Sequence, residues 1–139
     1  MNSLLTALKA HVKTAYSGIR LVEVIPHLAA VPNGSGFPSV GLMDSRTETT
    51  DEQEGLRDER LVVTVAVYVR YIKEADVIGT AGIAAITQTI RNYFSDLENV
   101  GGVQLLSAGP ISGITAGNLD QDFIIAKTFD ITFFREATT

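Results

Sequence analysis

The chain has 139 residues, of which 45% are hydrophobic and 19% charged, as is typical of a soluble globular protein. It contains no cysteine, which excludes disulfide frameworks, thiolate metal sites and cysteine nucleophiles. Much of the net charge of −5 comes from residues 44–60, which hold seven acidic residues and three arginines. Because phosphate-backbone binding needs clustered Lys and Arg, we expect no specific nucleic-acid binding.

The N-terminal region predicts one helix and two short strands. Five side chains recur at three- and four-residue intervals: Leu4, Leu5, Leu8, Val12 and Tyr16. This periodicity predicts an amphipathic helix over residues 3–16. Residues 19–26 predict a strand that Pro26 ends, and residues 37–44 predict a second strand with a bulge at Gly41.

Residues 45–59 form the acidic segment, in which Leu56 is the one large apolar residue. Such a segment cannot pack into a core, so we expect either a mobile loop or the extended tip of a hairpin. Its acids could bind a cation, a basic partner or nothing. A solvated mobile loop is the simplest interpretation, and the alternative is a segment that becomes ordered when a partner binds.

Residues 61–71 predict a long strand with two different faces. The first face is apolar and predicts the core: Leu61, Val63, Val65, Val67, Val69 and Tyr71. The second face mixes apolar and polar side chains: Val62, Thr64, Ala66, Tyr68 and Arg70. It is too apolar for an ordinary wet surface and too polar for a core. We interpret it as a surface that meets a partner.

A single main helix is predicted over residues 77–97, with Asp76 as its N-cap. Its apolar stripe steps every four residues: Ile78, Gly82, Ile86, Ile90 and Phe94. Gly79 and Gly82 each cost about 1 kcal/mol of helix propensity, so we expect a close backbone approach there, to the sheet or to a neighbouring subunit. Gly101 and Gly102 are expected to end this helix.

The remaining residues predict two further strands. The first covers residues 103–114 and is interrupted at Gly109-Pro110, a turn is expected at residues 115–121, and a long strand covers residues 122–136. The whole order predicts residues 1–139 to be a single α+β domain: one largely antiparallel sheet with two helices on one face.

No signature of catalysis or of cofactor binding occurs in the chain. Phosphate-binding loops, dinucleotide fingerprints, nucleophile elbows and HExxH spacing are all missing, and His11 and His27 lie in separate segments. Residues 118–122 place Asn and Asp as a calcium loop would, but Phe123 and Phe129 stand where that loop needs Gly and Glu. We therefore expect a protein that is not an enzyme, with no catalytic, cofactor or metal residues. No segment has the roughly 18 apolar residues of a membrane span, and no secretory signal is recognisable, so no membrane partner is expected.

The order of elements resembles the tail terminator and tail-completion proteins of phages, lambda-type minor tail protein U among them. The resemblance covers residues 3–136 and rests on four segments: FPSVGLMD, RLVVTVAVYVRY, ADVIGTAGIAAITQTIRNYF and KTFDITFFRE. It implies a structural virion protein of a phage or prophage, located in the tail or neck and assembled in the host cytoplasm. It also implies a homo-oligomeric ring, typically a hexamer, that ends the tail tube and joins it to the head. The implied partners are the protein itself, the tail-tube protein and a head–neck connector.

We expect the interface of such a ring on two sets of residues. One is the second face of the 61–71 strand: Val62, Thr64, Ala66, Tyr68 and Arg70. The other lies in the acidic segment: Glu48, Asp51, Glu52, Glu54 and Arg57. Three alternatives remain. One is another head–tail connector or neck protein, which shares the same oligomeric features. The second is a small-molecule-binding or enzymatic α+β domain whose pocket forms only in three dimensions, and the third is a stand-alone regulatory dimer.

Overall fold

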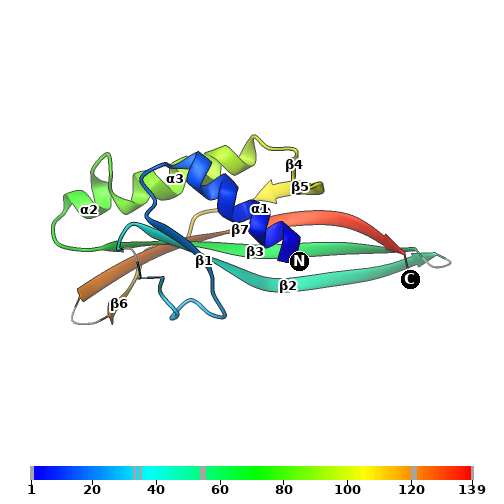
Figure 1. The fold of residues 1–139 in the computed structure, drawn as a ribbon, viewed down its shortest axis with the longest axis horizontal. Helices are drawn as coiled ribbons and strands as arrows, with labels where there is room; N and C mark the ends of the chain where they lie inside the picture. The colour runs from blue at the N-terminus through cyan, green and yellow to red at the C-terminus, as the bar shows by residue number, and fades with distance from the viewer. Residues whose placement is uncertain (1, 33, 35, 54–55, 120–121, 139) are drawn as a thin grey trace.

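A seven-stranded sheet with helices on one face forms this fold (Figure 1), seen in a computed structural model that describes residues 2–32, 34, 36–53, 56–119 and 122–138. In chain order the elements are α1 (Asn2–Ala15), β1 (Leu21–Val24), β2 (Ser39–Gln53), β3 (Leu56–Arg70), α2 (Ala75–Ile78), α3 (Ile83–Ser95), β4 (Asn99–Val100), β5 (Val103–Ala108), β6 (Thr115–Leu119) and β7 (Asp122–Thr138). The strand order is β1-β2-β3-β7-β5-β4, and β6 also pairs with β7. Only β1 and β2 pair in parallel among the described strand pairs, which confirms the predicted α+β class.

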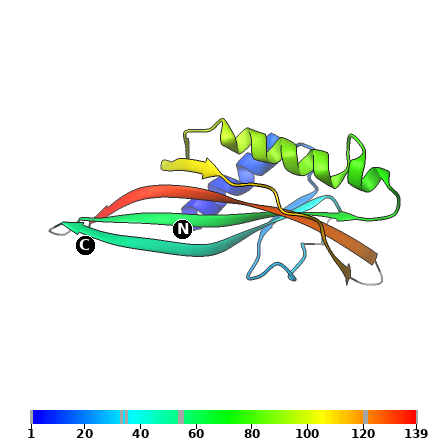
Figure 2. The same cartoon turned by 180° about the vertical axis from the view of Figure 1, so that it is seen from behind.

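The main core lies between the helices and one face of the sheet (Figure 2). The predicted apolar face of β3 is buried from Leu61 to Val69, and it pairs with an apolar face of β7: Val65 lies opposite Phe129 and Leu61 opposite Phe133. From the other side, α1 contributes Leu4, Leu5, Leu8 and Val12, and α3 contributes Ile83, Ile86, Ile90 and Phe94. Tyr71, predicted on the same face, follows the end of β3 and is 39% exposed.

The acidic segment is not a loop in the described residues but a continuation of the sheet. Antiparallel pairing of β2 with β3 continues as far as Gln53 opposite Leu56, so residues 45–53 and 56–59 are strands. The extended hairpin, one of the two expected states, is therefore the state present. Its register shifts fall between Asp44 and Arg46 and between Asp51 and Gln53, whereas the bulge expected at Gly41 is absent. Polar residues can form strands here because the backbone supplies the ladder hydrogen bonds.

The predicted single helix is two helices, α2 and α3, separated by the two glycines. Gly79 is the C-cap of α2 and Gly82 the N-cap of α3, both with extended backbone. A Cβ on Gly82 would lie 2.7 Å from the carbonyl oxygen of Ala75, so the close approach expected at these glycines is made to α2 itself. Asp76 does not cap a helix N-terminus, because its Oδ2 accepts hydrogen bonds from the backbone N–H groups of Ile72 and Lys73 at 2.7 and 2.8 Å. These two bonds lower the pKa of Asp76.

Two further elements differ from prediction in the C-terminal half. Gly101 and Gly102 have positive φ angles of 57° and 80° and make the tight turn between β4 and β5, six residues after α3 has ended. Residues 115–119, expected in a turn, form β6, in which Asn118 pairs with Phe123. Asp120 of the rejected calcium pattern lies outside the described residues.

Candidate functional site

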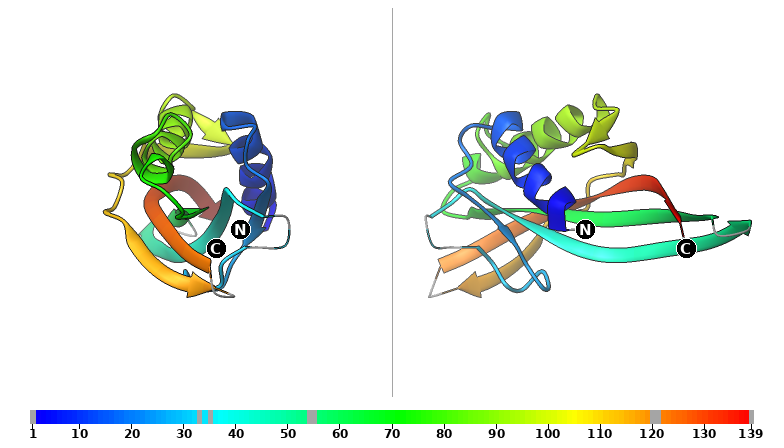
Figure 3. Two further views of the ribbon diagram at one scale, coloured as in Figure 1. Left: turned by 90° about the vertical axis from the view of Figure 1, so that its left-hand side faces the viewer. Right: turned by 45° about the vertical axis from the view of Figure 1, so that its right-hand side comes forward.

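The second face of β3, predicted to meet a partner, is covered by the chain itself. Val62, Thr64, Ala66 and Tyr68 are 2%, 6%, 0% and 2% exposed, and only Arg70 of the predicted set is open to solvent. Ala66 and Tyr68 belong to a second apolar cluster with Ile25, Ala30, Val31, Phe37, Met43, Ile124 and Ala126. Several of these come from the segment between β1 and β2, which lies on the side of the sheet away from the helices (Figure 3). The four buried side chains therefore do not form a partner surface.

Tyr68 fixes that covering segment to the sheet. Its hydroxyl donates a hydrogen bond of 2.7 Å to the backbone carbonyl of Leu28, while its ring packs against the apolar cluster. Burial raises the pKa of Tyr68 to about 12, so the phenol is neutral near pH 7. A neutral phenol can keep donating this hydrogen bond.

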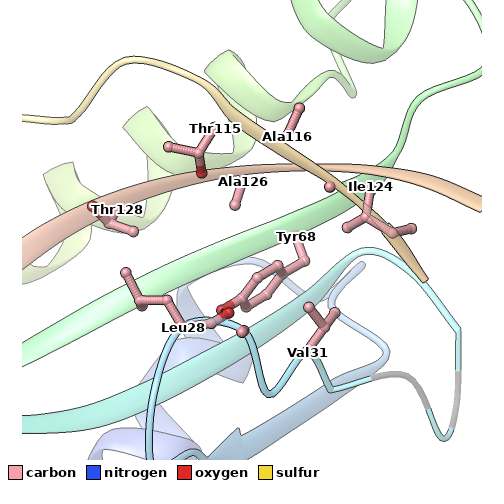
Figure 4. Close-up of a pocket in the computed structure, with 10 residues that line it drawn as sticks. Leu28, Val31, Tyr68, Thr115, Ala116, Ile124, Ala126 and Thr128 are labelled. Atoms are coloured by element: carbon pink, nitrogen blue, oxygen red, sulfur yellow. The ribbon is translucent and has the colours of Figure 1, made fainter.

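A cavity of about 230 Å³ remains open beside Tyr68 (Figure 4). It is lined by Leu28, Ala29, Val31, Tyr68, Thr115, Ala116, Gly117, Ile124, Ala126 and Thr128. The segment between β1 and β2 borders it on one side and β6 with β7 on the other (Figure 4). Tyr68 is the one titratable residue among these described lining residues. The cavity is smaller than the 300–1,000 Å³ of common small-molecule sites, and its lining suits an apolar group rather than a reacting one.

Thr64, a polar residue of the second face, forms hydrogen bonds with polar side chains of the two neighbouring strands. The Thr64 hydroxyl lies 2.7 Å from the Ser45 hydroxyl and donates to Oδ1 of Asp130 at 2.7 Å, which joins β2, β3 and β7 across the sheet. The sequence pattern does not predict these hydrogen bonds, because they depend on the register of three strands. They explain why Thr64 can be buried.

The histidines do not build a metal site in the part of the chain that the structure describes. Nδ1 of His11 lies 2.7 Å from the Tyr93 hydroxyl, so this side chain helps to pack α1 on α3. His27 is exposed in the segment after β1. The described residues contain no group of three or more His, Cys, Asp or Glu that could hold a metal ion.

The most protruding feature is an arm that we call the hairpin arm: residues 47–53 of β2, 56–60 of β3 and 135–138 of β7. It extends past the helices (Figures 1 and 3). The neighbouring strands do not accompany it, since β1 pairs with β2 only as far as Leu42 and β5 pairs with β7 only as far as Phe134. At about 3.4 Å per residue, the five arm residues of β3 span roughly 17 Å. The outer edges of β2 and β7 have no partner strand here among the described residues.

The predicted acidic interface residues lie on this arm as far as the structure describes them. Glu48 is exposed and accepts from Nε of Arg46 at 2.8 Å, and Glu59 pairs with Nη2 of Arg135 at 2.9 Å. Asp51, Glu52 and Arg57 belong to β2 and β3, and Glu54 lies outside the described residues, as do the side chains of those three. The arm thus combines exposed backbone edges with charged side chains. Such edges are ready to pair with another chain.

The architecture is therefore an α+β sheet with helices on one face and a projecting three-stranded arm. No protein-family model matches the chain, and no curated protein matches it. Among the 35 solved chains that match is one from a structure described as the virion of a native gene transfer agent (GTA) particle. That match has a TM-score of 0.56 at 11% sequence identity and covers 96% of both chains. The two chains share a fold over nearly their whole length. None of the helices within the described residues could cross a membrane.

Proposed function

We propose that this protein is a structural component of a phage-like particle, forming a ring that ends the tail tube and joins it to the head. The observation that carries the proposal is the match, over 96% of both chains, to a virion component. A ring of six copies, a tail-tube partner and a head–neck partner belong to the proposal, as does its location in the tail or neck of a virion. No catalysis is part of it.

The hairpin arm supports this role physically. Its residues lie beyond Leu61, the last core residue of β3 toward the turn, so the arm adds little to the core of its own subunit. Its two open edges belong to different strands, β2 and β7. An interface between two different surfaces is head-to-tail, and such interfaces close into rings when the rotation allows it.

A head–tail connector or neck protein would use the same assembly physics. The two roles differ in which surface the protein meets first: a terminator caps tail tubes made without heads, and a connector binds heads made without tails. Negative-stain imaging of both kinds of particle with added protein separates them. The proposal predicts density at the ends of headless tails.

The cavity beside Tyr68 supports the other alternative, a small-molecule-binding domain. A volume of about 230 Å³ would admit a fragment-sized apolar compound. A thermal-shift screen tests this, and a ligand that binds a compact monomer with no ring formation would favour it over the virion role.

Shortening the hairpin arm tests the proposed function directly. Glu48 pairs with Arg60, so deleting residues 49–59 and joining these two by an Asn-Gly turn removes the end of the arm without changing the remaining register. We expect the shortened protein to keep a cooperative unfolding transition and the helical part of its circular-dichroism spectrum, with a smaller strand contribution, together with loss of rings and of joined particles. A matched control changes Gln88 and Thr89 on the exposed side of α3 to Ala and should keep both. Normal rings and full infectivity in the shortened variant would contradict the proposal.

A further inference from the structure

We propose that the hairpin arm of one copy binds the exposed side of α1 in the next copy, with Asp58 and Glu136 facing Lys9 and Lys13. This inference rests on the proposed ring and names one of its contacts. The partner surface is thus a second copy of this chain. The two surfaces are complementary in charge and in spacing.

The basic half of the contact lies on α1. Lys9 and Lys13 are exposed and four residues apart on the helix, on the side that adjoins the buried stripe containing Leu8 and Val12. Residues at this spacing have Cβ atoms about 5–6 Å apart, so the two ammonium groups repel each other. Residues 1–22 contain no acid at all, and neither lysine forms an ion pair with a described residue. This side of α1 is therefore an uncompensated basic surface.

The acidic half lies on the hairpin arm. Asp58 of β3 is directly opposite Glu136 of β7 in the ladder, which places their Cβ atoms about 4.5–5.5 Å apart. Like charges directly opposite each other destabilise a sheet. The next pair along the same two strands, Glu59 and Arg135, forms an ion pair, but neither Asp58 nor Glu136 forms one with a described residue.

The two pairs fit each other. Both consist of two like-charged side chains whose Cβ atoms are about 5 Å apart, so one acid can face each lysine at the same time. Association then replaces two repulsions by two attractions. Arg60 lies two residues from Asp58 on the same strand face and opposite Glu48 in the register, but Glu48 pairs with Arg46, so Arg60 is a cation near the acidic pair.

The length of the hairpin arm and the head-to-tail symmetry of a ring also agree with a contact between copies. Asp58 and Glu136 lie at the end of an arm that extends past the helices, so a neighbouring subunit can contact them (Figure 3). Alternation along β3 puts Asp58 on the same side of the sheet as Val62 and Thr64, away from the helices of its own subunit. An arm-to-α1 contact joins two different surfaces and is head-to-tail, as a ring requires.

Charge reversal is the first test. Two double variants are made: one combines Lys9→Glu with Lys13→Glu, and the other combines Asp58→Lys with Glu136→Lys. Each should weaken self-association about tenfold in sedimentation velocity. Raised salt should weaken the self-association of the unaltered protein. Mixing the two double variants, so that an arm carrying the lysines meets an α1 carrying the glutamates, should restore association. A control with the same change of four charges, Lys73→Glu with Gln88→Glu and Thr89→Glu, should not weaken it. Unchanged association in both reversed variants, or no restoration on mixing, overturns the contact.

Disulfide trapping is the second test and does not depend on charge. Because the chain has no cysteine, Lys13→Cys and Asp58→Cys can be made separately and mixed under oxidising conditions. A covalent dimer should form in the mixture far faster than in either variant alone. Equal rates in all three samples overturn the contact.

The two tests separate this inference from the proposed function. Rings that form normally in the reversed variants, without trapped dimers, would remove the arm-to-α1 contact and leave the ring role standing. Trapped dimers from a protein that never forms rings or binds tail ends would support the contact and remove the ring role.

Discussion

The hydroxyl of Tyr68 donates a hydrogen bond of 2.7 Å to the backbone carbonyl of Leu28, 40 positions earlier in the chain. This bond attaches the segment between β1 and β2 to the face of the sheet that the helices leave open. Together with the apolar contacts of the second cluster, it covers side chains that the sequence pattern predicts to meet a partner.

Removing this hydroxyl should destabilise the fold modestly. In Tyr68→Phe the half-buried hydrogen bond to the carbonyl of Leu28 is lost while the ring stays, so we expect a loss of about 1 kcal/mol in the free energy of unfolding. Urea denaturation followed by circular dichroism measures it. Tyr71→Phe, at a side chain that is 39% exposed, is the matched control and should change little. Equal effects of the two substitutions would mean that the bond contributes nothing.

The raised pKa of Tyr68 should make the free energy of unfolding fall at alkaline pH. Burial raises the pKa of Tyr68 from 10.0 to about 12, so between these values the unfolded chain loses the proton and the folded chain keeps it. The contribution of Tyr68 to stability is complete below pH 10 and is lost as the pH rises toward 12. Urea midpoints at pH 8, 10 and 11 should fall less steeply for Tyr68→Phe than for the unaltered protein. Parallel curves for the two proteins would rule this out.

Gly41 should not tolerate a side chain. A Cβ added there would collide with Cδ1 of Ile25, which is buried in the second cluster. We expect Gly41→Ala to cost about 1–3 kcal/mol, and Gly113→Ala, where a Cβ meets no atom within 4 Å, to be far milder. In a double-mutant cycle, Ile25→Val removes the colliding methyl group, so the double variant should lose less than the sum of the two single losses. Strict additivity would show that the collision is relieved in another way.

Arg91 should stabilise the connection that follows β5. Its Nε donates to the carbonyl of Gly109 at 2.6 Å and its Nη2 to that of Ala108 at 2.9 Å, which ties α3 to the end of the strand. Arg91→Met keeps much of the apolar stem and removes both bonds, with an expected loss of about 2 kcal/mol. Arg91→Lys keeps the charge but not the planar guanidinium group, so its stability should lie between those of the unaltered protein and Arg91→Met. Thermal unfolding of the three proteins checks this order. If Arg91→Lys is as unstable as Arg91→Met, the stabilisation comes entirely from the two guanidinium hydrogen bonds and not from the charge.

The strands and helices that bury one clear face could be predicted from the sequence. Leu61, Val63 and Val65 alternate with other residues, and this two-residue period fixes the side of a strand on which they lie. The same holds for Phe129, Ile131 and Phe133 of β7, and the four-residue spacing of Ile86, Ile90 and Phe94 predicts α3. Gly79 and Gly82 mark the break between α2 and α3, but glycines inside an apolar helical stripe are equally compatible with close packing of one continuous helix.

Tertiary structure alone decided two features on which the proposed interface depends. Ala66 and Tyr68 are buried because distant segments pack against them, and Thr64 can be buried because Ser45 and Asp130 form hydrogen bonds with it. Alternation along one strand carries no information about either. Likewise, the acidic segment becomes strands because its backbone pairs with β3, whose other edge pairs with β7. Composition determined that this segment lies outside the core. Only the register determined that it is an arm and that Asp58 faces Glu136, since cross-strand neighbours are set by pairing and not by sequence distance.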